Sequence, residues 1–489
     1  MERPGIQRWW RVAGGLFGLL IPGWMSAADG WVRHRLIEGS TFLEDCPICD
    51  RVSIPSPLRG SFDLRLEETN PLFTRHALRN IDWTTHDAGG GEVRIRGEGE
   101  LEVGGEVAIT QRLRLDVEVS LGGTNIARHF AQELGPVVRP WPNLAADVDA
   151  EERTLTQSFR IGLRSAPFRE LWFVTANGFT PGIVRGTERG YRPAGDVLSL
   201  DGRVVRVNEE LTERLGIMPA VPPLALGAFE VMPGGIPMFS LRETVFSETL
   251  GGLTPGHVLT GEGRIVGTVE ALLKEFGSRP GSVPVPGVDA LQVLEDGEVL
   301  FSTDADVTTE EGVLGHGDVL GSGGRVLHRF KELMSAFEPV AGQDLAGVGL
   351  DALHVWPHGE VWFSVNGGFE SGKVGGIGPG DVLSNGGWIV YRNLELLGRF
   401  MPLEDLADFG LVGLFAVGDG PGSGRAVEMK VMRDGDVLRL GWSGEARVFQ
   451  VESATALEGP YRVRSEVMLE REWTVPMTGE AGWYRVVGW

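Results

Sequence analysis

The sequence predicts a mainly β fold in which a β-propeller-like repeat domain stands between two smaller β domains. Two observations point to this class. Glycine is abundant, at 72 of 489 residues, and tryptophan at 14 outnumbers tyrosine at 4, a composition typical of a turn-rich β protein. The chain also contains nearly the same phrase four times, as in "GPGDVLSNGGWIVYR" from residue 378. Such recurrence is the signature of a repeat architecture.

The composition narrows the classes of partner. The formal net charge is −22, and this negative charge repels phosphate groups, so no nucleic acid or anionic membrane is expected as a partner. Hydrophobic residues make up 42% of the chain, which is enough for a packed core and excludes a disordered protein. The length is that of a chain divided into several domains.

A secretory signal peptide is predicted over residues 1–28. Arginines precede an apolar run at residues 12–24, and three small residues follow this run at 26–28, the order expected of a signal peptide with its cleavage site. The alternative is a membrane anchor, which needs about 20 apolar residues, whereas this run is shorter and contains Pro22. We expect cleavage near Ala28, no transmembrane segment afterwards, and a protein that is secreted or extracytoplasmic, in the periplasm or at the cell surface.

Residues 29–160 are predicted to form an N-terminal antiparallel β domain. Within it, residues 92–120 alternate apolar and charged side chains, the pattern of strands with one face on a core and the other in water. The glycine clusters of this domain lack the strand-to-helix context of a phosphate-binding loop. We therefore expect a sheet with one solvated face and no recognisable nucleotide site.

Cys46 and Cys49, the two cysteines of the chain, form a CxxC pair in "EDCPICDR". In an exported protein the favoured hypothesis is a small local disulfide. A redox pair is one alternative, but its reactive cysteine normally lies at a helix start, and "RVSIPSP" with its β-branched residues and prolines follows here. A zinc site is the other; it takes four ligands, and no nearby histidine has the matching spacing.

Residues 161–432 contain the repeats. The glycine of "GDVL" or "GHVL" recurs at intervals of 61, 61 and 63 residues. A leucine stands sixteen positions after it and a leucine or phenylalanine twenty positions after it, so the two share one face of a helical turn. In the third repeat they are Leu333 and Phe337, which we expect to close the core between neighbouring repeats. The glycines are Gly195, Gly256, Gly317 and Gly380.

A second phrase lies between the copies of the first, with "FS" pairs at Phe239, Phe301 and Phe363. Each copy has two apolar runs around a turn, which predicts a hairpin. A divergent version begins at Phe168 and a fifth begins at Gly410. One unit of about 62 residues therefore predicts four strands, the blade of a β-propeller-like domain with four to five blades. An open β array of the same units is the alternative.

Residues 433–489 predict a small C-terminal β module. Strand-like segments alternate here, with Trp442 early and Tyr484 late, a pattern similar to part of a fibronectin III-like sandwich. The tail is short for a complete sandwich of that kind, so we expect an accessory module.

Three segments carry a resemblance to a protein family: residues 46–66 with "CPIC" and "PLRGSFDLRL", residues 349–364 with "GLDALHVWPHGEVWFS", and residues 442–452 with "WSGEARVFQVE". On these segments the chain resembles a family of uncharacterised exported bacterial proteins with an N-terminal CxxC β domain, blade-like repeats and a C-terminal β module. The resemblance implies export and this domain layout and supplies no catalytic residue. Gly227 and His257 stand where the family has aspartates, which argues against a metal site common to all repeats.

Several carboxylates obey the repeat. Residues that do so usually serve the fold, and we interpret them as hydrogen-bonding groups at turns and strand ends. No cofactor is predicted. Calcium is conceivable at the aspartates because it prefers oxygen ligands, but no compact DxDxDG loop is present, and no other metal site is expected. The carboxylates are Asp196, Asp318 and Asp381, Asp289 with Asp351, and Glu298 with Glu360.

Residues that break the repeat gather in its last complete unit and are the candidate binding residues. Exposed aromatic rings stack on sugars or on protein partners, and packing inside a blade is the alternative. The two histidines flank a hairpin turn without a third ligand, so they make a weak metal site. The candidates are His354, Trp356, His358, Trp362, Trp388 and Tyr391.

The catalytic residues stay unknown, because a serine-hydrolase elbow, a Walker loop and an HExxH motif are all absent from the sequence. We predict a secreted binding or scaffolding protein with a protein or glycan ligand. The alternative is an extracytoplasmic carbohydrate-active enzyme with carboxylates in the propeller channel, since a glycosidase needs two carboxylates roughly 5 to 9.5 Å apart. The centre of the ring distinguishes them: it holds either carboxylates from different repeats or an apolar plug.

Overall fold

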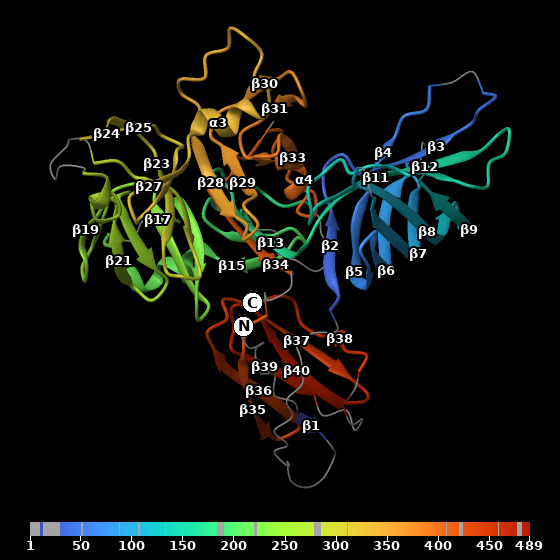
Figure 1. The fold of residues 1–489 in the computed structure, drawn as a ribbon. Helices are drawn as coiled ribbons and strands as arrows, with labels where there is room; N and C mark the ends of the chain where they lie inside the picture. Colours follow the sequence, from blue (N-terminus) through green and yellow to red (C-terminus); the bar gives the residue numbers. More distant parts are fainter. Residues whose placement is uncertain are drawn as a thin grey trace. The chain divides into compact units, whose positions relative to one another are not determined.

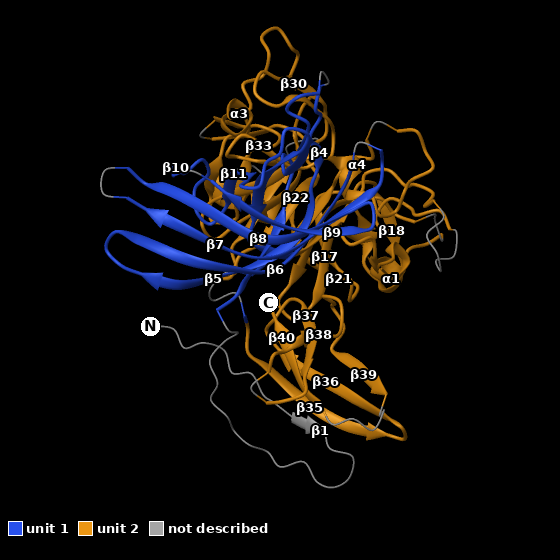
Figure 2. Cartoon of the chain, turned by 90° about the vertical axis from the view of Figure 1, so that its right-hand side faces the viewer, with its two compact units in different colours: residues 1–4, 26–169, 417–424 blue, residues 5–25, 170–416, 425–489 orange. Residues whose placement is uncertain are grey.

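The computed structural model is mainly β, which confirms the predicted class. It describes residues 10–12, 30–49, 52–87, 89–105, 108–132, 134–182, 190–219, 223–277, 285–310, 312–406, 408–419, 424–457, 459–476 and 482–489. Figure 2 shows the two compact units of the chain: unit 1 consists of residues 1–4, 26–169 and 417–424, and unit 2 of residues 5–25, 170–416 and 425–489.

Unit 1 is built on one antiparallel sheet that closes on itself. Its strand order is β11-β9-β8-β7-β6-β5-β2-β12-β3-β4, and β12 also pairs with β11. The long strands are β5 (Arg59–Thr69), β6 (Phe73–His86), β7 (Glu92–Gly104), β8 (Thr110–Leu121) and β9 (Thr124–Ala131). The shorter ones are β2 (Val32–Leu36), β3 (Thr41–Asp45), β4 (Ser56–Pro57), β10 (Gly135–Pro136), which pairs with β8, β11 (Leu144–Ala150) and β12 (Ser158–Ala166).

The core of unit 1 follows from the alternation along these strands. On β7 and β8 the apolar residues are buried in one cluster, for example Ile95 and Val119, and their charged neighbours face solvent, for example Arg96 and Glu118. The expectation of a sheet with one solvated face is thereby confirmed. Cys46 and Cys49, which follow β3, form a disulfide with Cα atoms 5.3 Å apart, as favoured over a redox or zinc pair.

The repeat region of unit 2 contains, among its described residues, four sheets of four strands each (Figure 1). Each predicted unit of two hairpins forms one sheet. The second sheet has the order β16 (Leu226–Met232), β17 (Ile236–Leu241), β20 (His257–Thr260), β21 (Arg264–Thr268); the third β22 (Val288–Val293), β23 (Val299–Thr303), β26 (Val319–Gly321), β27 (Arg325–His328); and the fourth β28 (Leu350–Val355), β29 (Val361–Val365), β32 (Val382–Ser384), β33 (Trp388–Tyr391).

The first sheet combines strands from both ends of the repeat region. Its order is β15 (Val204–Arg206), β14 (Val197–Ser199), β13 (Phe168–Val174), β34 (Gly413–Gly418). The N–H of Val412 donates to the carbonyl of Val174 at 2.8 Å. The phrase that begins at Gly410 therefore completes the first sheet instead of starting a fifth one.

The inner strands β34, β16, β22 and β28 are linked to one another in sequence. A Cβ at Gly413 would lie 2.6 Å from Cβ of Phe229, so the glycine permits the close approach of β34 to β16. Hydrogen bonds also join neighbouring sheets: 2.7 Å from Ser240 Oγ of β17 to Val288 O of β22, 3.1 Å from Gln292 Nε2 of β22 to Val355 O of β28, and 3.0 Å from Ser364 Oγ of β29 to Leu411 O, just before β34.

A short helix follows each outer strand: α1 (Asn208–Thr212), α2 (Val269–Leu272), α3 (Phe330–Ser335) and α4 (Asn393–Leu396). Leu333 and Phe337 are 2% and 0% exposed and belong to one core cluster with Leu350 and Phe363 of the following sheet. The rings of Phe337 and Phe363 lie edge to face at 6.2 Å. The prediction that this apolar turn closes the core between neighbouring repeats is confirmed.

The repeated aspartates of "GDVL" hold the starts of these helices. Their carboxylates accept a hydrogen bond from the first helical N–H, which would otherwise lack a partner. The pairs are Asp196 with Asn208 at 2.8 Å, Asp318 with Phe330 at 2.9 Å, and Asp381 with Asn393 at 2.8 Å. Their interpretation as structural hydrogen-bonding groups is confirmed.

Three small hairpins lie between the second and third strands of the last three sheets. They are β18 (Val245–Ser247) with β19 (Gly251–Leu253), β24 (Val307–Thr309) with β25 (Gly312–Leu314), and β30 (Phe369–Ser371) with β31 (Gly375–Ile377). Ser371 Oγ donates to the carbonyl of Phe337, so the third hairpin adds to the contact between neighbouring repeats.

The C-terminal module packs two sheets around a core that includes Trp442 and Phe449. One sheet contains β35 (Val427–Asp434), β36 (Val437–Gly444) and β39 (Glu472–Pro476); the other contains β37 (Phe449–Ala454), β38 (Arg462–Val463), β40 (Gly482–Gly488) and β1 (Trp10–Val12). β1 falls within the expected signal peptide; the rest of residues 1–28 lies outside the described residues.

Candidate functional site

Equivalent residues stand at the start of the inner strands β16, β22, β28 and β34, and those of the first three line one cavity. Gly227, Asp289, Asp351 and Gly413 occupy equivalent places, each 62 residues after the one before. Gly227, Asp289 and Asp351 line one cavity, whereas the space at Gly413 is filled by Phe229 and Val174. We call this cavity of about 280 Å³ the axial pocket.

The rim of the axial pocket comes from the residues that follow the second strand of each sheet. Arg242 follows β17, Asp304 follows β23 and Asn366 follows β29, and all three are exposed. Asp351 below them is 2% exposed. The pocket thus has a charged floor and a polar rim that are supplied by three different repeats.

The polar contacts of the pocket leave one carboxyl without a donor. Arg242 Nη2 lies 3.3 Å from Asp351 Oδ1, and the N–H of Gly287 donates to Asp304 at 2.7 Å. The carboxyl groups of Asp289 and Asp351 are within hydrogen-bonding reach of one another. Among the described residues no N–H group donates a hydrogen bond to Asp289.

Burial shapes the ionisation of this pair. It raises the pKa of Asp289 well above its ordinary range, and the negative charge of Asp351 raises that pKa further. Burial also raises the pKa of Asp351, while the nearby Arg242 guanidinium lowers it. Asp351 is buried and Asp289 is half-buried, and two poorly solvated carboxyl groups this close favour a state in which they share one proton.

The other end of the inner strands is filled by the C-terminal module. Arg447 Nη1 lies 3.3 Å from the buried Glu230 carboxylate, and its Nη2 donates to the carbonyl of Val293. The Glu230 carboxylate also accepts a hydrogen bond from the N–H of Val293 at 3.3 Å. Burial raises the pKa of Glu230 to about 7 against the opposing effect of Arg447. We call this cluster the arginine plug.

Four of the six binding residues expected from the sequence lie together. Trp356 contacts His354, His358 and Trp362 with ring centroids 4.6, 6.2 and 4.9 Å apart. Trp362 Nε1 donates to the buried carboxylate of Glu360 at 2.9 Å. Of this group, His354, Trp356 and Trp362 are buried and His358 is exposed. Their aromatic surface is therefore largely taken up by packing.

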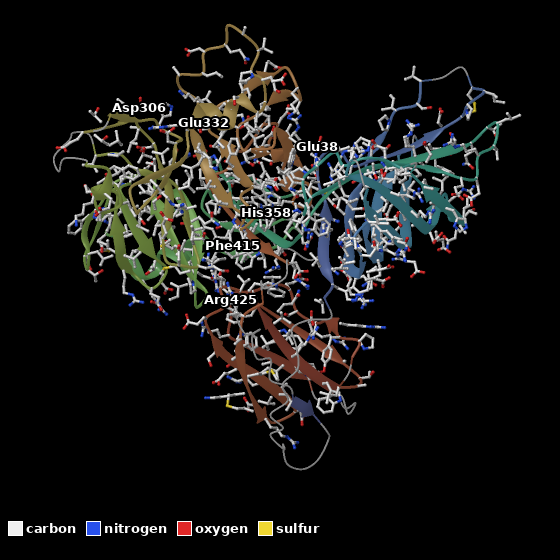
Figure 3. The ribbon with its side chains drawn as sticks, viewed as in Figure 1. Glu38, Asp306, Glu332, His358, Phe415 and Arg425 are labelled. Atoms are coloured by element: carbon white, nitrogen blue, oxygen red, sulfur yellow. A yellow bond between two sulfur atoms is a disulfide. The ribbon has the colours of Figure 1, made fainter. Side chains whose placement is uncertain are left out.

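The other two expected residues lie at opposite ends of β33. Trp388 begins the strand and is half-buried, and Tyr391 ends it and is 2% exposed. Figure 3 labels His358 and Phe415. Phe415 lies on β34, and its ring centroid is 5.5 Å from that of Trp172. Neither Trp388 nor Tyr391 lines the axial pocket.

Sequence analysis recognised two residues of the axial pocket, Asp289 and Asp351, and assigned them to the fold because they obey the repeat. It missed Arg242 and Asp304. A signal was present: the same repeat position reads glycine, aspartate, aspartate, glycine. A structural hydrogen bond common to all repeats would need the same polar residue in each of them. A position that is glycine in two repeats and aspartate in the other two therefore suggests a role outside the fold.

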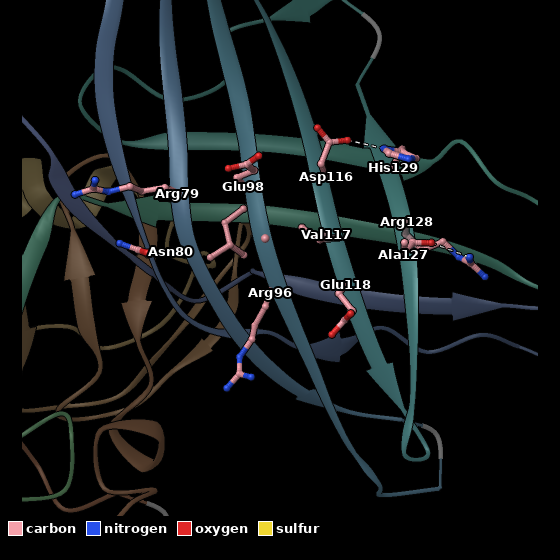
Figure 4. A pocket seen from close by; sticks show the side chains of 12 residues that line it. Arg79, Asn80, Arg96, Glu98, Asp116, Val117, Glu118, Ala127, Arg128 and His129 are labelled. Atoms are coloured by element: carbon pink, nitrogen blue, oxygen red, sulfur yellow. Dashed lines mark hydrogen bonds and ion pairs between the residues drawn. The ribbon is translucent and has the colours of Figure 1, made fainter. Parts of the chain in front are cut away.

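Unit 1 has a wider, shallower hollow on its sheet, with a volume of about 650 Å³ (Figure 4). Glu98 faces Asp116 directly across β7 and β8, and Asp116 contacts His129 Nδ1 at 2.5 Å. The hydrogen bond to Asp116 raises the pKa of His129. This surface is open and mixed in charge, so it defines a ligand less well than the axial pocket does.

One further group of carboxylates was found among the described residues of unit 2. Oxygen atoms of Glu170, Asp201 and Glu466 lie within 4.8 Å of one another. Arg203 Nη2 lies 3.9 Å from Glu170, and Asp201 and Glu466 are exposed. Solvent and the neighbouring arginine therefore account for these charges without a bound ion.

Comparisons with solved structures give only distant likenesses. The extracellular domain of a protein described as a one component system from B. thetaiotaomicron is 8% identical, with a TM-score of 0.21 over 90% of this chain and 81% of that one. The extracellular domain of a protein described as a hybrid two component system from the same organism is 9% identical, with a TM-score of 0.20 over 86% and 72%.

PorZ, a surface component of the type-IX secretion system of Porphyromonas gingivalis, is 13% identical, with a TM-score of 0.17; the likeness covers 87% of this chain and 57% of that one. No family model and no curated protein sequence matches this chain. Likenesses at these TM-scores assign it neither a family nor an activity.

Proposed function

We propose that this chain is an extracytoplasmic binding protein whose repeat domain is a four-bladed propeller-like ring with its ligand site in the axial pocket. The observation that carries the proposal is that Asp289 and Asp351, from two different repeats, line one cavity. Sites of this kind, concave and lined by a few polar groups from separate elements, are where proteins bind small ligands or ligand groups.

The Cys46–Cys49 disulfide supports the extracytoplasmic location, because disulfides persist in oxidising compartments. The expected signal peptide at residues 1–28 agrees with it. Within the described residues, no helix combines the length and the apolar character required to cross a membrane. We also propose that the chain belongs to the family of exported bacterial proteins that its sequence resembles; this membership predicts no activity.

The carboxylate geometry favours binding over glycoside hydrolysis. A glycosidase keeps its two carboxyl groups roughly 5 to 9.5 Å apart so that a sugar or a water molecule fits between them. Asp289 and Asp351 are within hydrogen-bonding reach of one another, which is closer than either mechanism uses. The carbohydrate-active enzyme therefore stands as the second candidate, supported only by the presence of carboxylates in the axial pocket.

The pocket also indicates what a ligand must supply. Three carboxylates line it, at Asp289, Asp304 and Asp351, against one guanidinium at Arg242. Acceptors outnumber donors, and a buried acceptor without a donor is costly. A ligand that brings N–H or O–H donors is therefore favoured. The binding role expected for His354, Trp356, His358, Trp362, Trp388 and Tyr391 stays a prediction.

Calorimetric titration tests the proposal, with short cationic, neutral and anionic peptides and a set of methyl glycosides as probes. We expect at least one probe to bind the wild-type chain and to lose about tenfold or more in affinity in the Asp289→Asn/Asp351→Asn variant. Asp296→Asn is the control, because it makes one substitution of the same kind on an exposed turn of the third sheet.

Two outcomes would overturn the proposal. Equal binding of every probe to wild type and to the double variant would place the site elsewhere. Hydrolysis of a glycoside that disappears in the double variant and persists in Asp296→Asn would identify the enzyme instead.

A further inference from the structure

We propose that the axial pocket captures the guanidinium or ammonium group of a basic side chain and that its entry displaces a proton held between Asp289 and Asp351. This inference rests on the proposed function, because it assigns a ligand class and a pH dependence to the same pocket. It starts from the half-buried carboxyl group of Asp289, which lines a cavity and receives no hydrogen bond from any N–H of the described residues.

The charges around the pocket come from every sheet that reaches it. Arg242 contributes the one positive charge, Asp304 and the Asp289–Asp351 pair contribute the negative ones, and Asn366 is neutral. Among the described residues, the lining of the pocket includes none from the first sheet. Of the nearby titratable groups, His316 is occupied by Asp306, whose carboxylate lies 2.7 Å from its Nδ1.

These charges give a simple balance. With one proton shared by the pair, the pocket carries one net negative charge. When the proton leaves, the pocket carries two negative charges, and a monovalent cation returns it to one. Exchange of a proton for a cation therefore leaves the charge of the pocket unchanged, so the cation enters without adding uncompensated charge to a poorly solvated site.

An organic cation fits this pocket better than a metal ion. Calcium takes 6 to 8 oxygen ligands at about 2.3–2.6 Å, and within the described residues the group of three acidic side chains that meet within 4.8 Å lies elsewhere, at Glu170, Asp201 and Glu466. The carboxylates of the axial pocket are instead spread around a cavity of about 280 Å³. A planar or tetrahedral group with several N–H donors reaches such spread acceptors at once.

Arg242 shows that a guanidinium group can lie beside the carboxylates of the pocket. Its guanidinium, which comes from a different repeat, lies 3.3 Å from Asp351. It leaves Asp289 without a donor, so a second cationic group has a carboxyl to bind. The arginine plug fills the opposite end of the inner strands, and a ligand therefore approaches from the rim formed by Arg242, Asp304 and Asn366.

The proton exchange follows from the same arrangement. Burial and the neighbouring charges raise the pKa of Asp289 above its ordinary range, so the empty pocket keeps a proton at pH values where a free aspartate has lost it. A cation binds the ionised pair more tightly than the protonated one. On binding, the carboxyl O–H bond breaks, its electrons stay on the carboxylate, and water or buffer takes the proton. Affinity should therefore rise with pH until the pair is ionised.

Calorimetry in two buffers of different ionisation enthalpy tests this inference, because the difference in heat reports protons released. The probes are N-acetyl-arginine amide, N-acetyl-lysine amide, the uncharged isostere N-acetyl-citrulline amide, methyl glucoside and calcium chloride. We expect the arginine or lysine probe to bind about tenfold or more tightly than the citrulline probe. We also expect proton release at about pH 5 and tighter binding at about pH 8.

Asp289→Asn should abolish the proton release, and Asp296→Asn should preserve it, with melting curves confirming that both variants fold. Preference for citrulline, glucoside or calcium, or cation binding without proton release, would overturn this inference and leave binding in the axial pocket intact. If none of the basic, neutral or sugar probes binds, or if binding ignores Asp289 and Asp351, the proposed function falls as well.

Discussion

The two ends of the inner strands both carry polar residues, but the hydrogen bonding of these residues differs between the ends. At the arginine plug, Glu230 is paired with Arg447 and accepts hydrogen bonds from the backbone, and Gln292 bonds both the N–H and the carbonyl of Val355. At the axial pocket, Asp289 has no N–H donor among the described residues. A polar group that the fold satisfies serves the fold, whereas one left facing a cavity marks a site.

Removing Arg447 should give the largest effect on stability. Arg447→Ala leaves the buried carboxylate of Glu230 without its counter-charge, and breaking a buried pair from one side costs about 3–5 kcal/mol. We expect this loss in the free energy of unfolding at about pH 8 and a smaller loss at about pH 5, where Glu230 is protonated. Denaturant titration followed by tryptophan fluorescence measures it.

Arg425→Ala is the matched control for the arginine plug. Arg425 pairs with Glu295, which is largely exposed, and exposed pairs contribute about 0–1 kcal/mol. A second variant, Arg447→Ala/Glu230→Gln, should recover part of the lost stability because no buried charge remains. Equal stability of Arg447→Ala and Arg425→Ala would remove the contrast between the two ends of the ring.

Leu333→Ala tests whether the ring is held by contacts between repeats. Leu333 is 2% exposed in the core cluster that joins two sheets, and truncation of a buried leucine costs about 2–5 kcal/mol. Leu394→Ala, on the exposed side of α4, should change stability by less than about 0.5 kcal/mol. Thermal and denaturant unfolding of both variants compares them, and a neutral Leu333→Ala would contradict the interlocked ring.

Much of this ring could be predicted from the sequence, because its signals are local. The four-residue spacing of Leu333 and Phe337 predicts a buried helical face, and Asp318 in "GDVL" predicts a turn-side hydrogen bond. The closure could not be predicted in the same way. The phrase at Gly410 has the pattern of a new unit, and only the three-dimensional fold pairs its strand with β13, which lies far away in sequence.

The axial pocket escaped sequence analysis for a physical reason. Asp289 and Asp351 obey the repeat, so their pattern matches that of structural residues such as Asp318. What separates them is that both line a cavity beside Gly227 and that Asp289 has no N–H donor among the described residues. Arg447 was equally hidden, because it reaches the ring from the C-terminal module.

The stability of the folded chain should depend on pH through Glu230 of the arginine plug. Its pKa of about 7 in the folded protein lies above its ordinary value of 4.5, so the folded state holds a proton that the unfolded state releases between these values. Stability should therefore be higher at about pH 5 and should fall by about 2 kcal/mol as pH rises through about 7. Glu230→Gln should flatten this part of the curve, and stability that rises over the same range would contradict the assignment.

Asp289→Asn should have the smallest effect and the opposite sign. The raised pKa of Asp289 means that the folded protein must either ionise a poorly solvated carboxyl or keep its proton, and both disfavour the folded state above the ordinary aspartate pKa. Asparagine removes this cost and retains a side-chain amide that donates to Asp351. We expect Asp289→Asn to stabilise the chain by up to about 1 kcal/mol at about pH 8. The gain should vanish below about pH 4, where aspartate is protonated in both states.

Melting temperatures at the two pH values measure it. If Asp289→Asn instead destabilises the chain as Arg447→Ala does, then Asp289 stabilises the fold. The polar residues at both ends of the inner strands would then be structural.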